Sequence, residues 1–230
     1  MRKNGIAGSV AALVLVAALV LSGCPGGNGL DEDPHYDTWD DLVLEGQVWV
    51  LEQGEDGELR YVEFGQSRAV STMIGIGEGS IVAGRLHFRL GIPHNDWFES
   101  ITAATFTRSR SRTVTISGAG RQAAWLEHLE VPAPPGGGFS SSLFRMHNHG
   151  NIREQVRWVF VDGALTVSAP RSVEEFLGEN TTYEAFELRL SAGWNAVRFQ
   201  SEEDAGGNIT ERIFQGDSDD EGMRWVLGLW

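Results

Sequence analysis

Hydrophobic and polar residues alternate with a period of two over much of the chain after residue 41. Such alternation is typical of β-strands with one buried face, because successive side chains point to opposite faces. Residues 42–51 and 59–64 show it on either side of the polar cluster 54–58, which predicts a β-hairpin. Further strands are predicted at residues 81–90, 100–108, 113–117, 125–131 and 223–230.

Two more hairpins are predicted in the C-terminal half. Residues 157–161 and 164–168 flank Asp162 and Gly163, a dipeptide that suits the tight turn between antiparallel strands. The second hairpin spans residues 183–200 and turns at a Ser-Ala-Gly sequence.

Two other segments interrupt the strands. Residues 171–178 predict one helical turn, and residues 132–142, rich in Pro, Gly and Ser, predict a long loop that divides the domain into two halves. Sustained helical periodicity is absent after the N-terminal segment, so we expect an all-β fold over residues 42–230. The expected architecture is an antiparallel β-sandwich, with Greek-key connections as one option.

The first 23 residues have the layout of a signal peptide. Arg2 and Lys3 precede an apolar run at residues 10–21, which is shorter than the roughly 20 residues that a membrane-spanning helix needs. The following residues are small and end at Cys24. We therefore expect this segment to direct export rather than to span a membrane.

The sequence Leu21, Ser22, Gly23 and Cys24 resembles the lipobox of bacterial lipoproteins. That resemblance implies cleavage after residue 23 and a diacylglyceryl group on the Cys24 sulfur, which would anchor the exported domain to a membrane. Cys24 is the only cysteine of the chain, so the monomer forms no disulfide. A secreted protein with an ordinary cleavage site is the alternative.

Residues 24–41 are expected to form a tether, because they are rich in Gly, Asp, Glu and Pro and too poor in aliphatic residues to build a core. In the lipoproteins resembled here, an acidic residue after the cysteine is associated with retention in the inner membrane. This chain has Pro25 there. The outer membrane is therefore the expected location where two membranes exist, and a cell membrane otherwise.

The charge of the chain bears on its partners. The formal charge is −14, and removal of residues 1–23 takes away two basic residues and no acidic one, which leaves −16. Nucleic acid is not expected as a partner of so negative a chain, because binding to phosphates depends on Lys and Arg contacts. Lys3 is the only lysine. Codon bias and adaptation to high salt both explain this composition.

His147 and His149 are the candidate metal ligands, because residues i and i+2 of a strand share one face. A third ligand would have to come from another segment of the chain. The candidates for it are Glu127, His128, Glu130 and His87.

Calcium is the candidate cofactor of an acidic segment near the C-terminus, because Ca²⁺ prefers carboxylate oxygens. Its spacing is not that of an EF-hand loop. Solvated acidic turns are the alternative reading. The candidate ligands are Asp217, Asp219, Asp220 and Glu221.

Trp39, Trp97 and Trp194 adjoin polar or turn residues and are candidates for a platform on which a sugar ring stacks. The motifs of common hydrolases, G-x-S-x-G and H-E-x-x-H, are absent from the sequence. We therefore expect a non-catalytic envelope or surface lipoprotein that binds a partner or has a structural role. A calcium- or saccharide-binding lipoprotein is the second reading, and a metal-dependent hydrolase that uses His147 and His149 is the third.

Overall fold

The computed structural model describes seven stretches of the chain between residues 41 and 228, all within the unit Trp39–Trp230 that residue contacts define. Most of these residues lie in strands. The described stretches are residues 41–55, 57–72, 77–107, 112–133, 140–176, 179–216 and 222–228.

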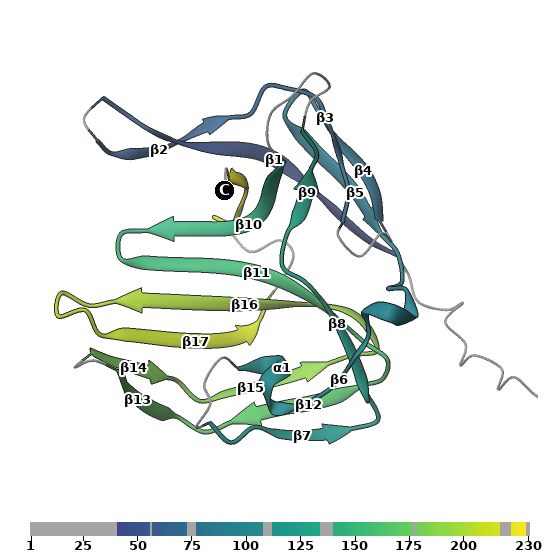
Figure 1. Ribbon diagram of the computed structural model, residues 1–230, viewed down its shortest axis with the longest axis vertical. Coiled ribbons are helices and arrows are strands. Elements are labelled where there is room, and N and C mark those ends of the chain that lie inside the picture. Colours follow the sequence, from purple (N-terminus) through teal and green to yellow (C-terminus); the bar gives the residue numbers. More distant parts are fainter. Residues whose placement is uncertain are drawn as a thin grey trace, which may run out of the picture. The chain divides into compact units, whose positions relative to one another are not determined.

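A large mixed sheet of fifteen strands carries most of the fold (Figure 1). Its order is β13 (Ser172–Phe176), β14 (Glu179–Tyr183), β17 (Ile209–Gln215), β16 (Gly193–Glu203), β11 (Ile152–Val161), β10 (Ser141–His149), β18 (Arg224–Gly228), β1 (Leu42–Gln53), β5 (Arg85–Leu90), β4 (Gly77–Val82) and β3 (Arg68–Val70). Four strands lie off this path, namely β2 (Leu59–Glu63) on β1, β8 (Gln122–Leu126) on β11, β6 (Glu99–Ser100) on β8 and β9 (Leu129–Val131) on β10.

A small antiparallel sheet and two short helices complete the described elements. The small sheet has the order β15 (Phe186–Leu190), β12 (Leu165–Ala169) and β7 (Thr115–Gly118). The helices are α1 (Ala103–Phe106) and a 3₁₀ turn at Asn95–Trp97. The prediction of a mostly β fold is therefore confirmed.

The expectation of a purely antiparallel arrangement is wrong. β1 pairs with β18 and β14 pairs with β17 in parallel, whereas the other pairings of the large sheet are antiparallel. The two partners of each parallel pair are distant in sequence or separated by other strands, so no short turn constrains their direction.

Several predicted strand boundaries also differ from the structure. The segment 81–90 breaks at a turn where Ala83 and Gly84 have φ values of 47° and 81°, so it belongs to two strands, β4 and β5. Residues 100–108 contain the end of β6 and helix α1, and residues 171–178 contain strand β13 instead of a helical turn. The hairpin of β1 and β2 and the final strand β18 are confirmed.

The two predicted C-terminal hairpins are wrong in their pairing, although their segments are strands. β12 pairs with β15 and β7, and β11 pairs with β10, β16 and β8, so the turn at Asp162 carries the chain from one sheet to the other. Asp162 Oδ1 accepts hydrogen bonds from the backbone N–H groups of Arg121 and Gln122, at 2.7 and 3.0 Å. The turn is thereby tied to β8. The connection from β15 to β16 also crosses between sheets.

β11 separates two hydrophobic cores because both of its faces are buried. Trp158 belongs to the first core, where it stacks on Trp225 with ring centroids 5.3 Å apart, together with residues from β1, β4 and β5. Val159 and Val161 belong to the second core, which packs against the small sheet. Figure 1 shows β10, β11, β16 and β17 side by side, with the small sheet below. The candidate site lies on the face of these strands that carries the second core.

Candidate functional site

A groove of about 850 Å³ lies where this face of the large sheet extends past the second core. β8, β10, β11, β16 and β17 contribute lining residues, and α1 contributes on one side. The lining residues that matter below are Phe106, Trp125, Glu127, His128, Phe144, Arg153, Gln155, Arg157, Phe199 and Ser201.

The alternation of β11 determines which polar side chains reach the groove. Arg153, Gln155 and Arg157 line it, while the intervening Glu154 and Val156 are buried on the opposite face. At about 3.3 Å per residue, the row from Arg153 to Arg157 is about 13 Å long. Its length suits an elongated ligand.

Arg157 is held in a fixed position at one end of this row. Its Nη1 lies 2.6 Å from Glu127 Oε1, its Nε donates to Gln155 Oε1 at 3.3 Å, and its guanidinium lies 4.7 Å from the centroid of the Phe199 ring. The Arg157 side chain is 14% exposed and that of Glu127 is 50% exposed. Arg157 therefore supports a carboxylate that still has surface free to accept hydrogen bonds from a ligand.

Aromatic rings form the apolar part of the groove. Trp125 packs edge-on against Phe106 and is tilted against Phe199, with centroid distances of 5.7 and 5.9 Å. Phe144 and His128 form a second tilted pair at 5.2 Å. Trp125 Nε1 is buried and has no hydrogen-bond partner, so the groove meets the ring of Trp125 and not its N–H group.

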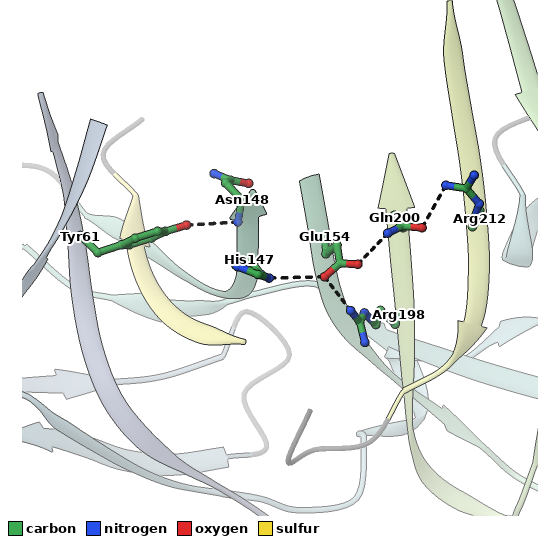
Figure 2. A network of polar contacts seen from close by, with 7 residues as sticks. All are labelled: Tyr61, His147, Asn148, Glu154, Arg198, Gln200 and Arg212. Carbon is green, nitrogen blue, oxygen red and sulfur yellow. Dashed lines mark hydrogen bonds and ion pairs between the residues drawn. The ribbon is translucent and has the colours of Figure 1, made fainter. Parts of the chain in front are cut away.

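A polar network on the opposite face ties the same strands together (Figure 2). Glu154, 6% exposed, accepts hydrogen bonds from Arg198 Nη2 at 2.6 Å and from Gln200 Nε2 at 2.8 Å. Gln200 Oε1 in turn accepts from Arg212 Nη1 at 3.1 Å, and Arg212 Nη1 also pairs with Glu202 at 2.9 Å. These contacts join β11, β16 and β17, the strands that form much of the groove floor.

The predicted metal ligands His147 and His149 lie on β10 with stacked rings, 6.0 Å between centroids. His147 Nδ1 is 3.6 Å from Glu154 Oε2 (Figure 2). Within the part of the chain that the structure describes, no group of three His, Cys, Asp or Glu side chains is placed to hold a metal ion. The suggested third ligands lie elsewhere, because Glu127 and His128 line the groove on the other face of the sheet and His87 pairs with Glu45.

The predicted platform residues Trp97 and Trp194 differ in their surroundings. Trp97 is 43% exposed at the end of the 3₁₀ turn. Trp194 is half-buried against the first core, where its Nε1 donates to the carbonyl of Gly91 at 2.9 Å and its ring meets Phe160 edge-on. Sequence reasoning missed Trp125, because nothing in its strand distinguishes a groove-lining tryptophan from a core tryptophan.

Several predicted features lie outside the described residues, among them the signal peptide at residues 1–23 and most of the tether. None of the helices that the structure describes has the length and apolar character needed to cross a membrane. The candidate residues outside the described ranges are Cys24, Trp39, Asp217, Asp219, Asp220 and Glu221.

Comparisons of the chain with models of protein families, with curated proteins and with solved structures found no match.

Proposed function

We propose that this chain is a membrane-anchored envelope lipoprotein whose domain binds a saccharide, without catalysis, in the groove on the large sheet. The anchor follows from the lipobox resemblance at Cys24, and the outer membrane is the proposed location where two membranes exist. The formal charge of −16 after removal of residues 1–23 argues against nucleic acid as a partner.

The single observation that carries the proposal is the combination of ring surfaces with fixed hydrogen-bonding groups in one groove. Sugar rings present apolar C–H faces beside hydroxyl groups, so their sites combine aromatic side chains with a few well-placed polar groups. Trp125, Phe144 and Phe199 supply the rings. Glu127 and Gln155, both in contact with Arg157, supply the polar groups.

The contact with Arg157 positions Glu127 for hydrogen bonding. Arg157 Nη1 lies 2.6 Å from Glu127 Oε1, and the Glu127 side chain is 50% exposed. The carboxylate oxygens are therefore held at the groove, where they accept hydrogen bonds from ligand hydroxyls.

We also propose that residues 42–230 form the functional domain and that the region around the second core is a β-sandwich. Val167 and Leu188 of the small sheet share that core with Val159 and Val197 of the large sheet. Such face-to-face packing of two sheets is the defining contact of a sandwich.

The test is a saccharide-binding screen of the full chain purified in detergent, read by calorimetric titration of each hit. Glu127→Gln removes the charge and one acceptor from the groove, and a hydrogen bond to a charged group is worth about 1.5–3 kcal/mol, so we expect roughly tenfold weaker binding or more. Glu187→Gln is the matched control. The side chains of Glu187 and Glu127 are similarly exposed, at 53% and 50%. Glu187 also pairs with an arginine, Arg189, but it lies on the small sheet.

The control variant should bind as the unmodified chain does. A screen in which no saccharide saturates the protein, or equal affinities for the Glu127→Gln and Glu187→Gln variants, would refute the proposal.

A further inference from the structure

A second hollow of about 900 Å³ adjoins the groove along the same strands. It lies between the β10–β11 turn, the β1–β2 hairpin and the β16–β17 turn. Arg153 lines both the groove and this second hollow, so its side chain lies where the two meet. Leu51, Leu59, Asn148, Glu203 and Asp204 are among its other lining residues.

Arg153 differs in its pairing from Arg157, the other arginine of β11 that lines the groove. Arg157 is bound to Glu127. Arg153 is exposed, and within the described part of the chain its side chain makes no hydrogen bond or ion pair. Its guanidinium is therefore available to a ligand.

Asp204, which lines the second hollow with Arg153, is held by its own turn. Asp204 Oδ1 accepts hydrogen bonds from the backbone N–H groups of Gly206 and Asn208, at 2.8 and 2.9 Å, and its Oδ2 accepts from Asn208 Nδ2 at 2.9 Å. The hydrogen bonds from the side chain and backbone of Asn208 lower the pKa of Asp204. Its charge is used to hold the β16–β17 turn.

We propose that the ligand of the groove is an acidic oligosaccharide that lies along β11 and places a carboxylate on Arg153, where the two hollows meet. This inference rests on the proposed function and adds the chemical class of the saccharide. A planar guanidinium binds a carboxylate through two parallel hydrogen bonds, which gives both affinity and a fixed orientation.

The surroundings of Arg153 suit such a ligand. Asn148 and Ser201 are its direct partners on the neighbouring strands β10 and β16, so their side chains flank it at about 5 Å between Cβ atoms and offer hydrogen bonds to the hydroxyls beside the carboxylate. The row of about 13 Å from Arg153 to Arg157 exceeds one sugar ring, so the acidic unit occupies one end of an oligomer.

The experiment compares two probes on the full chain in detergent, a short oligogalacturonate and the same oligomer with its carboxylates methyl-esterified. We expect the acid to bind at least tenfold more tightly than the ester. Arg153→Gln should remove that difference and leave the affinity for the ester unchanged. Arg85→Gln is the control, because Arg85 is also exposed and without an ion pair in the described structure but lies on β5, outside the groove.

Each other outcome overturns a different statement. Equal binding of acid and ester by the unmodified chain, or equal weakening by Arg153→Gln and Arg85→Gln, removes the acidic ligand and leaves saccharide binding in place. Binding of neutral saccharides in the screen without binding of either probe also removes it. Failure of every saccharide removes the proposed function together with this inference.

Discussion

Replacement of Glu154 by alanine should destabilise the domain strongly. The Glu154 side chain is 8% exposed and that of its partner Arg198 is 22% exposed. Removing one partner of a buried ion pair costs about 3–5 kcal/mol, because the other charge stays buried without compensation. Arg198 retains some contact with water and lies 5.2 Å from the Phe214 ring centroid. We therefore expect a loss of about 3 kcal/mol in the free energy of unfolding.

Two further variants separate charge from packing. Glu154→Gln keeps the size of the side chain and one acceptor, so we expect a smaller loss of about 1–2 kcal/mol. Glu187→Gln breaks an ion pair in which the side chains of Arg189 and Glu187 are 81% and 53% exposed. Exposed pairs contribute about 0–1 kcal/mol, so this variant should differ little from the unmodified chain.

The assay is urea unfolding of the full chain, followed by tryptophan fluorescence. Urea is uncharged and does not screen the ion pairs as guanidinium does. The slope of the transition should stay constant, so that the midpoint reports stability. A loss below about 1 kcal/mol for Glu154→Ala, comparable to that of the exposed pair, would refute the reasoning that burial makes this network important.

Two other predictions concern stability. Burial, together with the nearby charge of Glu211, raises the pKa of Tyr183 above 10.0. The tyrosine therefore ionises first in the unfolded chain, and the free energy of unfolding should fall as the pH rises above about 10. In the same urea titrations the free energy of unfolding of Tyr183→Phe should fall less over this pH range, and identical pH profiles for the variant and the unmodified chain would contradict this prediction. In Gly79→Ala the new Cβ would lie 2.3 Å from the His87 carbonyl oxygen, so we expect a loss of about 1–3 kcal/mol. Gly65→Ala, with no atom within 4 Å of the new Cβ, should lose nothing by thermal unfolding, and equal losses in both variants would disprove the steric argument.

Period-two alternation located much of the strand structure from the sequence. It placed β1, β2 and β18, and it showed residues 157–161 and 164–168 to be strands. It failed at residues 100–108 and 171–178, where a short helix and a strand replaced the expected elements. Short segments of mixed pattern take the conformation that their tertiary contacts favour, because local propensity is weak over so few residues.

The candidate site was less accessible from the sequence. Glu127 and His128 stood out as metal-ligand candidates, and both line the groove. Trp125 and Arg153 carried no signal, because a groove residue and a core or surface residue have the same local pattern. Among the described residues no third ligand lies beside His147 and His149 to complete the expected metal site. Two of the candidates, Glu127 and His128, lie on the other face of the sheet.

The sequence by itself determined the acidic charge, the single cysteine within a lipobox-like segment and the β character of the domain. Only the tertiary structure decided which strands pair, how Asp162 carries the chain between two sheets, and that Arg153, Arg157 and Trp125 share one groove. The physical reason lies in what alternation encodes. Alternation indicates which face of a strand is buried. The identity of the partner strand and of the opposing layer depends on contacts between residues far apart in the chain.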